Sequence, residues 1–499
     1  MVQLDPIPRP VDHLLLGLPD APALIDQAGA WSFAEVETAV AAVARWLGDE
    51  GWAAGERVAT WLPKTRLACV MPLAVARAGL VHVPINPLLR RAQVAHILAD
   101  SGARALVTQA ARAATLGVGD VPRACVVVDA ATLPLTGEGR GPSNADPQDL
   151  AAILYTSGST GLPKGVMLSH TNLWLGAISV AHYLRLESDD RVLGVLPLSF
   201  DYGQNQLFST WAAGATVAPL DYLAARDVIK AVERVGATTL AGVPPLWVQL
   251  LDAEWPADTA ARLRRLTNSG GALTPRLVER LRERFPAADL YAMYGLTEAF
   301  RSTYLDPSLI DTHPDAMGSA IPFAEVVAVR ADGSQAAPGE PGELVHAGPL
   351  VAQGYWRDPA RTAERFRAAP GFAAHGGIAV WSGDTVVQGE DGLFRFVGRD
   401  DEMIKTAGNR VSPAEVETAI LAGPEVAEAV AVGVADERIG QAIVVVATGD
   451  GAAEDALRAR LRGELPTFMQ PARYEWRGTL PRNANGKLDR AAIRAEVTR

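Results

Sequence analysis

The stretch "LYTSGSTGLPKGVMLSH" (residues 154–170) places a loop rich in glycine, serine and threonine between two apolar runs. Main-chain N–H groups of such a loop can converge on one point and bind an anion. The hydroxyl groups add donors, and Lys164 adds a full positive charge. The spacing is not the P-loop pattern G-x-x-x-x-G-K-[ST]. A loop of this composition alone would suit a flexible surface turn, but the ordered combination T-S-G-S-T-G-x-P-K-G favours a polyphosphate-binding loop.

Length and charge narrow the class of protein. With 499 residues the chain is too long for one hydrophobic core, so we expect at least two domains. The formal net charge of -11 argues against nucleic acid as a partner, because phosphate contacts need a basic surface. Hydrophobic residues make up 48% of the sequence, the usual share in a globular protein.

Cysteine content and hydropathy predict a cytoplasmic protein. The two cysteines, Cys69 and Cys125, lie in apolar stretches, which argues against a disulfide framework and a cysteine-ligated zinc site. The N-terminal "MVQLDPIPRP" lacks the pattern of a secretion signal. The longest apolar region, residues 68–85, is interrupted by Arg77, His82 and two prolines, so we expect no membrane association.

Strands and helices alternate through roughly the first 300 residues. Helical spacing occurs at 32–47, 65–80 and 91–102, and strand-like runs occur at 57–62, 81–85, 104–108 and 124–129. Such alternation favours parallel sheets with helices packed on their faces. Residues 301–400 are richer in glycine and proline and carry short β-type runs. The predicted fold class is therefore α/β, with helix-packed sheets and a β-rich portion at about 301–399.

A rise in charge density marks the start of a second domain. The charges gather in "VGRDDEMIK" (397–405). Beyond it the pattern predicts helices at 413–422 and 453–463 and strands at 426–434, 442–447 and 473–477. About 100 residues suffice for a small domain. We expect an N-terminal domain over 1–399 and a small α+β domain over 402–499, joined through residues 400–401.

Further motifs follow the loop in a definite order. They are "SGG" (269–271), "YGLTE" (294–298), "GELVHAG" (342–348), "SGDT" (382–385), "GRDDEMIKTAGNRVSPAEVE" (398–417) and "PRNANGKLD" (481–489). Together with the loop they resemble the AMP-forming adenylating enzymes, which include acyl-CoA synthetases, non-ribosomal peptide adenylation domains and luciferases. Several independent motifs in order are far more specific than one. The resemblance implies a two-domain ligase that uses ATP to adenylate an acid.

The resemblance also implies an ATP site with Mg²⁺. Glu298 would bind the metal through carboxylate oxygen, and Thr297 would touch the α-phosphate. The residues implied for the triphosphate are Thr156, Ser157, Gly158, Ser159, Thr160, Gly161 and Lys164. Those implied for adenine and ribose are Gly270, Gly271, Ala272, Tyr294, Gly295, Asp384 and Arg399. Without the resemblance, Glu298 would pass for an exposed glutamate, Asp384 for a turn residue and Arg399 for a surface residue.

The motif "NANGKLD" contains the expected catalytic lysine, Lys487. An acid anion and ATP repel each other, so a positioned ammonium offsets the repulsion and the charge that develops at phosphorus. The resemblance assigns this role to Lys487, which alone would suit a solvated turn. It further implies that the small domain rotates about Asp401 before a thiol attacks the adenylate. Lys405 and Gly408 belong to this thiolation step, unless "RDDE" is only a charged linker.

Asp201, in "LPLSFDYGQNQL" (196–207), bears on the class of acid. A buried carboxylate needs a cationic partner, and in amino-acid-activating relatives an aspartate here binds the substrate's α-ammonium. The alternative is that Asp201 caps a helix over 203–213. "SFDYG" and "YGLTEAFRSTYL" resemble stand-alone prolyl carrier-protein ligases and a set of acyl ligases near exosortase systems. The pocket candidates are Asp201, Tyr202, Asn205, Trp247, Met293 and Arg301.

We therefore expect a ligase that adenylates a small amino acid, with L-proline as the leading candidate. The chain ends soon after Lys487, so a phosphopantetheinylated carrier protein is expected to act in trans. The alternative is an acyl-CoA ligase that joins a fatty or other organic acid to free coenzyme A. A catalytically dead member that serves as a binding module is disfavoured, because the implied ATP, metal and lysine residues are all present. Both a monomer and a homodimer are compatible with the sequence.

Overall fold

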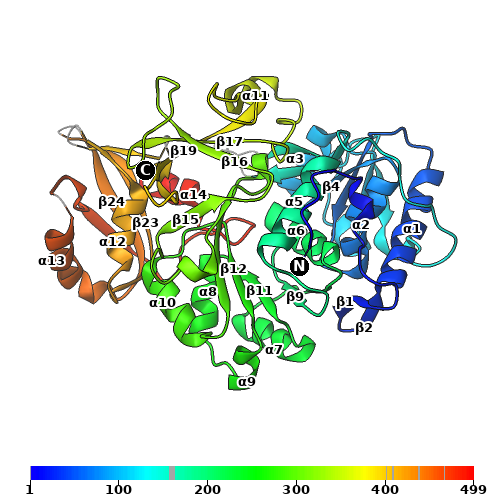
Figure 1. The fold of residues 1–499 in the computed structure, drawn as a ribbon, viewed down its shortest axis with the longest axis horizontal. Coiled ribbons are helices and arrows are strands. Elements are labelled where there is room, and N and C mark those ends of the chain that lie inside the picture. The colour runs from blue at the N-terminus through cyan, green and yellow to red at the C-terminus, as the bar shows by residue number, and fades with distance from the viewer. Residues whose placement is uncertain are drawn as a thin grey trace.

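Three sheets organise the chain into a large N-terminal domain and a smaller C-terminal domain, which lies at the left of Figure 1 in orange and red. The computed structural model describes residues 2–156, 163–399, 402–406, 409–436, 439–465 and 467–498. Sheets with helices packed on them form the large domain, so the predicted α/β class is confirmed.

The first sheet has the strand order β6-β5-β3-β4-β7-β8. Its strands are β3 (Arg57–Trp61), β4 (Val81–Pro84), β5 (Ala105–Thr108), β6 (Val126–Asp129), β7 (Leu150–Thr156) and β8 (Lys164–Ser169). The pairs are parallel except β7 with β8, whose antiparallel register aligns Thr156 with Lys164. The Gly/Ser/Thr loop thus joins two neighbouring strands, as predicted, although residues 157–162 lie outside the described part of the chain.

Six α-helices precede Ala213 in the described residues. They are α1 (Phe33–Asp49), α2 (Arg66–Arg77), α3 (Arg91–Ser101), α4 (Ala110–Ala113), α5 (His170–Tyr183) and α6 (Asp201–Ala212). The start of α1 is fixed by a capping box, in which Ser32 and Glu35 satisfy each other's main-chain N–H groups. The helices predicted at 32–47, 65–80 and 91–102 are therefore confirmed as α1, α2 and α3.

Helices α5 and α6 pack on each other inside the large domain (Figure 1). All residues of α6 and nearly all of α5 are buried. A helix that is buried on every side belongs to the core rather than to the surface. This matters for the site because Asp201 is the first residue of α6 and so enters the interior.

The second sheet has the order β16-β17-β19-β20-β15-β14-β13-β12-β11-β9-β10-β1-β2, with β18 beside β19. Its strands are β1 (Pro22–Asp26), β2 (Gly29–Ser32), β9 (Arg191–Gly194), β10 (Thr216–Pro219), β11 (Thr239–Gly242), β12 (Arg265–Asn268), β13 (Asp289–Tyr294), β14 (Thr303–Tyr304), β15 (Ala316–Ala320), β16 (Glu325–Val329), β17 (Pro341–Ala347), β18 (Phe366–Ala368), β19 (Ile378–Gln388) and β20 (Phe394–Arg399). Its helices are α7 (Ala225–Val235), α8 (Pro244–Leu251), α9 (Ala257–Ala261), α10 (Pro275–Arg284) and α11 (Pro359–Arg365).

This second sheet changes from parallel to antiparallel pairing at β13. Strands β9 to β13 pair in parallel, whereas β13 with β14 and every later pair are antiparallel. The change falls between Tyr294 and Thr303. It confirms the strand-rich region expected from about residue 301.

The small domain is a five-stranded sheet with helices on both faces. Its elements are β21 (Ile404–Thr406), β22 (Asn409–Val411), α12 (Pro413–Leu421), β23 (Val426–Asp436), β24 (Gly440–Gly449), α13 (Glu454–Glu464), β25 (Arg473–Trp476) and α14 (Arg490–Val497). Alternate residues of β23 and β24 join two separate clusters, one with α12 and α13 and one with α14. The helices and strands predicted for this domain are confirmed.

The two domains meet where the charge density rises. Strand β20 of the second sheet ends at Arg399, and β21 of the small sheet begins at Ile404. Residues 400 and 401 lie outside the described part of the chain. The boundary at 399–401 and a hinge there remain predictions.

None of the helices within the described ranges has both the length and the apolar run that crossing a bilayer requires.

A buried charge cluster ties α2 to α1 and to the N-terminal segment. Arg77 donates to Asp12 over 3.1 Å and to Glu37 over 3.0 Å, and Arg77 and Asp12 are both almost fully buried. Removing one partner of a buried pair leaves the other charge uncompensated. We predict that Arg77→Met lowers the free energy of unfolding of the large domain by about 3–5 kcal/mol, measured by urea denaturation.

Arg45 on α1 supplies the matched control. Its pair with Glu138, at 2.9 Å, is exposed to solvent. Arg45→Met should therefore cost only about 0–1 kcal/mol. Equal losses in the two variants would contradict the assignment of Arg77 to a buried cluster.

Candidate active site

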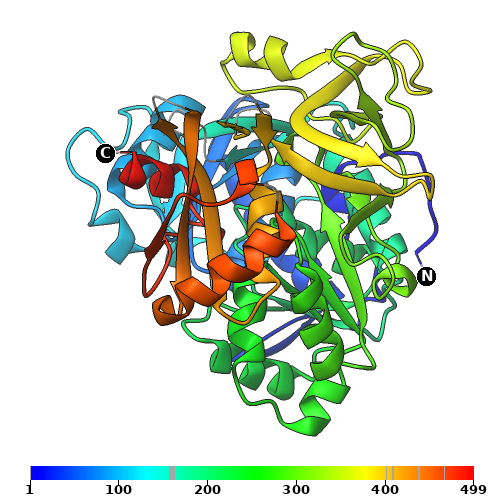
Figure 2. The same ribbon diagram turned by 90° about the vertical axis from the view of Figure 1, so that its left-hand side faces the viewer.

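A cleft of about 1800 Å³ opens between the two domains. The small domain lies against the large one in Figure 2, and residues of both line the cleft. The large domain contributes the ends of β7, β12, β13 and β19, and the small domain contributes α12, α14 and the segment 481–489. Of the residues singled out from the sequence, most of those that the structure describes line this cleft.

Lys164 and Glu298 form an ion pair on the floor of the cleft. The Lys164 ammonium lies 3.1 Å from Glu298 Oε1 and donates to the Tyr355 hydroxyl over 2.8 Å. Tyr355 in turn donates to the same Oε1 over 2.7 Å. Burial disfavours the charged form of Glu298, but the Lys164 ammonium and the Tyr355 hydroxyl outweigh it, so the pKa of Glu298 lies below its ordinary 4.5. Glu298 is therefore an ionised carboxylate.

Asp201 and Thr297 meet at one end of the cleft, here called the acid end after the carboxyl group of Asp201. The Thr297 hydroxyl donates to Asp201 Oδ1 over 3.1 Å, and Asp201 is only 4% exposed. Burial raises the pKa of Asp201 above its ordinary 3.8, although the charges of Arg301 and Lys487 oppose this shift. In the described part of the chain no ion pair to Asp201 is formed within 4.0 Å.

Asp201 does not cap its helix. The N-cap of α6 is Phe200, no side chain caps the helix, and Asp201 is its first helical residue. Its carboxylate bonds Thr297, which is 96 residues away in the sequence. The alternative interpretation of Asp201 as the N-cap of a helix over 203–213 is therefore wrong, because the carboxylate faces the cleft.

Tyr294 and Asp384 are joined across the second sheet. The Tyr294 hydroxyl donates to Asp384 Oδ2, and both side chains line the cleft. Asp384 stands in β19, where a bend with Gly383 at φ +69° lets the Ser382 hydroxyl accept from the Asp384 N–H. Gly270, Gly271, Ala272 and Gly295, which are also expected at the nucleoside, line the same cleft as Tyr294 and Asp384.

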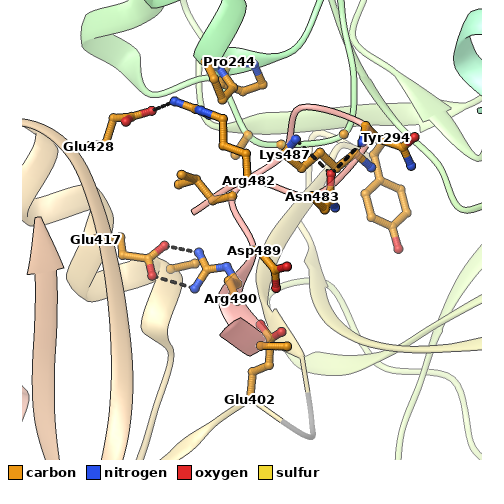
Figure 3. Close-up of a pocket in the computed structure, with 18 of the residues that line it drawn as sticks. Pro244, Tyr294, Glu402, Glu417, Glu428, Arg482, Asn483, Lys487, Asp489 and Arg490 are labelled. Carbon is orange, nitrogen blue, oxygen red and sulfur yellow. Dashed lines mark hydrogen bonds and ion pairs between the residues drawn. The ribbon is translucent and has the colours of Figure 1, made fainter. Parts of the chain in front are cut away.

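Lys487 is presented by a tight hairpin, here called the lysine hairpin (residues 481–489; Figure 3). Asn483 Oδ1 accepts the N–H groups of Asn485 and Lys487 over 3.0 and 3.1 Å. Gly486 sits at φ +79°, a conformation that favours glycine. The ends of the hairpin are anchored in the small domain, because Arg482 pairs with Glu428 and Arg490 pairs with Glu417.

The hairpin brings the Lys487 ammonium into the acid end of the cleft. Its Nζ lies 4.6 Å from the centroid of the Phe200 ring, next to Asp201 in the sequence. A Cβ atom at Gly270 would lie 2.4 Å from Lys487 Cε, so the absence of a side chain at Gly270 makes room for the lysine. Gly270 has φ +81°, which also favours glycine.

Beside Met293, which also lines the cleft, lies a small cavity of about 20 Å³, here called the inner cavity, with space for one water molecule. The candidates Tyr202, Asn205, Met293 and Arg301 line it. Arg301 is 2% exposed, donates to Ser269 over 2.9 Å and stacks on the Tyr202 ring. Buried polar atoms without a hydrogen bond face this region, among them Asn205 Nδ2, Gln206 Oε1, Thr239 Oγ1 and Arg301 Nε.

Several candidates lie outside these contacts. Trp247 is fully buried against Gly242 and lines neither the cleft nor the inner cavity. Thr156 and Lys164 line the cleft, whereas Ser157, Gly158, Ser159, Thr160, Gly161, Asp401 and Gly408 lie outside the described residues. The same holds for the side chains of Arg399 and Lys405.

Sequence reasoning missed Tyr355 and Asn86. Tyr355 holds both Lys164 and Glu298, and Asn86 bonds the lysine hairpin. The signal for Tyr355 was weak: it stands in "GYW" (354–356), where Gly354 has φ +120° and Tyr355 follows it into the core. Asn86 lies two residues after the end of β4, in "PINP" (84–87), a sequence typical of an ordinary turn.

Residues 15–356 match the family model described as AMP-binding enzyme, and residues 415–487 match the one described as AMP-binding enzyme C-terminal domain. An L-proline--[L-prolyl-carrier protein] ligase from Pseudomonas fluorescens is 31% identical over 502 residues, which cover 97% of this chain and 98% of that protein. A feruloyl-CoA synthase from an Amycolatopsis species is 32% identical, covering 95% and 96%. The chain spans only 6% of another relative, the probable non-canonical nonribosomal peptide synthetase CymA from Salinispora arenicola.

Solved structures agree with the sequence matches. The crystal structure of ATP-bound MatB from Rhodopseudomonas palustris superposes with a TM-score of 0.89 at 26% identity and covers 99% of both chains. Two family models that follow each other in this order account for both domains. The chain belongs to the family of AMP-binding enzymes and is an AMP-forming acid–thiol ligase, the class of reaction that its motifs predicted.

Proposed function

We propose that the chain adenylates a small amino acid, with L-proline as the leading candidate, and transfers it to the phosphopantetheine thiol of a separate carrier protein. One observation carries the amino-acid assignment. The buried Asp201 carboxylate has a neutral hydroxyl as its bonded neighbour, and its pKa is raised by burial. The α-ammonium of an amino acid would supply the direct cationic partner that a buried carboxylate needs.

Lys487 would act in the first half-reaction. A carboxylate oxygen of the acid attacks the α-phosphorus of ATP, and the bond from that phosphorus to the bridging oxygen breaks, which releases pyrophosphate. The Lys487 ammonium, beside Phe200 and Gly270, stands where it would bridge the acid and the α-phosphate and offset their repulsion. Thr297 would donate a further hydrogen bond to the α-phosphate.

The triphosphate would be bound by Thr156 and Lys164, together with Ser157, Gly158, Ser159, Thr160 and Gly161 of the same motif. Mg²⁺ often binds through one or two carboxylates plus substrate phosphates. The Glu298 carboxylate is ionised and lines the cleft, so it is the side chain that would hold the metal. No cluster of three or more metal-ligating side chains occurs among the described residues, so the phosphates would supply the remaining ligands. Bound Mg²⁺ would neutralise the charge of the β- and γ-phosphates.

The nucleoside would occupy the Tyr294 end of the cleft. Tyr294 would stack on adenine, and Gly270, Gly271, Ala272 and Gly295 would let the main chain approach it. The Asp384 carboxylate would accept hydrogen bonds from the ribose hydroxyls, with Arg399 on the other side. Asp384 is held in position by Tyr294 and by its own N–H bond to Ser382.

The inner cavity limits the size and charge of the acid. Its volume of about 20 Å³ holds one water molecule, so it would admit no long side chain beyond Met293. Arg301 in its wall would repel a second cation, so basic amino acids are disfavoured. Tyr202 and Asn205 would contact the side chain. These features suit a small, uncharged amino acid such as L-proline.

The thiol would enter in the second half-reaction, after rotation of the small domain about Asp401. The thiolate sulfur attacks the acyl carbon of the adenylate, and the bond between that carbon and the phosphate oxygen breaks, which releases AMP. Lys405 and Gly408 would line the thiol's path. The relatives support both a carrier protein and coenzyme A as acceptor, and we favour the carrier protein because of the prolyl relative. We propose a cytoplasmic location, in keeping with the two free buried cysteines, and a monomer or homodimer.

The proposal is tested by ATP–pyrophosphate exchange across a panel of amino acids, fatty acids and aromatic acids. We expect the highest rate with L-proline or another small amino acid. Cyclopentanecarboxylate has the shape of proline without the nitrogen and should support little exchange. Asp201→Asn should lower kcat/KM for the amino acid roughly 30-fold or more, since losing a buried charge pair costs about 2–5 kcal/mol. Exchange with plain acids alone would replace the proposal with the acyl-CoA ligase alternative.

A second prediction concerns the stability of the free protein. The folded chain holds the Asp201 proton more tightly than the unfolded chain does, so ionising Asp201 destabilises the fold as pH rises through the raised pKa. An asparagine at position 201 does not ionise, so it does not destabilise the fold in this way. Asp201→Asn should therefore have a higher Tm than the wild type at neutral pH, and the difference should shrink as pH falls toward 3.8.

Thermal unfolding between about pH 5 and pH 8 measures this difference. The exposed Asp20→Asn is the control and should leave Tm unchanged across the range. A lower Tm for Asp201→Asn at neutral pH would show that the carboxylate already has a sufficient partner in the free protein.

A third prediction concerns the space that Lys487 occupies. Gly270→Ala would place a Cβ against Lys487 Cε and displace the lysine, in addition to straining the chain at φ +81°. Exchange should fall strongly in Gly270→Ala and in Lys487→Ala, whereas thioester formation from supplied acyl-adenylate with coenzyme A or pantetheine should persist. Gly333→Ala, at φ +86° with open space around it, carries the same strain and should leave exchange unchanged. Unaltered exchange in Lys487→Ala would remove the lysine from the proposed chemistry.

A further inference from the structure

Asn86 connects the large domain to the lysine hairpin. Its Nδ2 donates to the Ala484 carbonyl over 2.8 Å and to Asn485 Oδ1 over 3.2 Å. Its Oδ1 accepts the Leu88 N–H over 2.9 Å. Asn86 is 5% exposed and lines the cleft. The Asn86 side-chain oxygen is therefore hydrogen-bonded within its own turn, and its side-chain nitrogen is hydrogen-bonded to the small domain.

Two main-chain groups of opposite polarity set the orientation of the Asn86 amide. The Leu88 N–H requires an acceptor, and the Ala484 carbonyl requires a donor, so oxygen and nitrogen cannot exchange places without losing both bonds. The turn itself is anchored in the first sheet, since Ile85 bonds Thr60 and Arg112 bonds the Pro87 carbonyl. Asn86 thus offers a donor from a rigid platform.

Hydrogen bonds within the lysine hairpin connect its tip, residues 484–485, to Lys487. Asn483 accepts the N–H groups of Asn485 and Lys487, and the Asn483 N–H donates to the Lys487 carbonyl over 2.8 Å. These bonds make residues 483–487 one unit (Figure 3). A bond to Ala484 and Asn485 therefore restricts where the Lys487 side chain begins.

We propose that Asn86 is a positioning residue for adenylation, which acts by holding the lysine hairpin against the large domain so that Lys487 reaches the acid and the α-phosphate. The inference rests on the proposed function, because it requires Lys487 to act in the first half-reaction. Asn86 does not touch the reacting atoms, so its loss should slow the chemical step and leave the binding of ATP nearly intact.

Asn86→Asp separates this role from a local structural one. Aspartate keeps the acceptor for the Leu88 N–H, and so keeps the turn, but it removes the donor and sets a carboxylate against the Ala484 carbonyl. The Asn485 amide could turn and donate to the new carboxylate, whereas the Ala484 carbonyl could not. Asn144→Asp, in an exposed loop, adds the same charge elsewhere and is the matched control.

The experiment measures ATP–pyrophosphate exchange with L-proline, or with whichever acid of the panel gives the highest rate. For Asn86→Asp we expect kcat to fall about tenfold or more, KM for ATP to stay within about twofold, and Tm to stay at the wild-type value. Asn144→Asp should match the wild type in all three. A wild-type kcat for Asn86→Asp, or a parallel decline in Tm and in ATP affinity, would overturn the proposal.

Measuring Lys487→Ala in the same experiment distinguishes the positioning role of Asn86 from the proposed role of Lys487 in adenylation. If Lys487→Ala loses exchange while Asn86→Asp retains it, the positioning role is wrong and the proposed function stands. If Lys487→Ala retains exchange, the proposed function of the lysine fails and the role of Asn86 fails with it.

Discussion

Under the proposed function, repulsion between an acid anion and a triphosphate is the constraint on which the cleft depends, and two lysines from opposite sides of the cleft would offset that repulsion. Lys164 stands at the start of β8 and pairs with Glu298, whereas Lys487 arrives from the small domain on a hairpin. Because the second ammonium belongs to another domain, the relative position of the domains controls whether the acid end carries its full positive charge. The cleft is thus a site that the fold assembles rather than one that a single sheet contains.

At the acid end of the cleft, the buried charge of Asp201 depends on nearby cations, which a carboxylate at the protein surface would not need because water solvates it. Asp201 is buried near Arg301 and Lys487, and its raised pKa reports the cost of keeping a carboxylate away from water. In bulk water these charges would interact weakly, but in a closed site each one changes the others. Under the proposed function, withdrawal of Lys487 would remove one of the cations that favour ionised Asp201. The two half-reactions would then run in different electrostatic surroundings.

Local pattern and motif order accounted for the fold class, the strand-rich region from about 301 and the elements of the small domain, and they named Asp201, Glu298 and Lys487, which the fold brings into one cleft. What they missed depends on long-range contact. Nothing near Asp201 in the sequence indicates that its partner is Thr297, so its helix-capping alternative looked equally good. Tyr355 gains its importance only when β8 and the η3 turn (Thr297–Ala299) come together around it. Trp247 is a large aromatic residue of the kind that often lines pockets, but the packing of α8 buries its side chain against Gly242.

The complete burial of α6 has a consequence for how such a ligase could acquire new substrates. The side chains that would sort acids, Tyr202 and Asn205, are also part of the interior that keeps the large domain folded. Substituting either residue changes the packing of the core and also which buried polar atoms have hydrogen-bond partners. Variants with altered selectivity should therefore arise most readily in backgrounds that have stability in reserve, and retargeting by evolution or by design would proceed through stabilising changes made first.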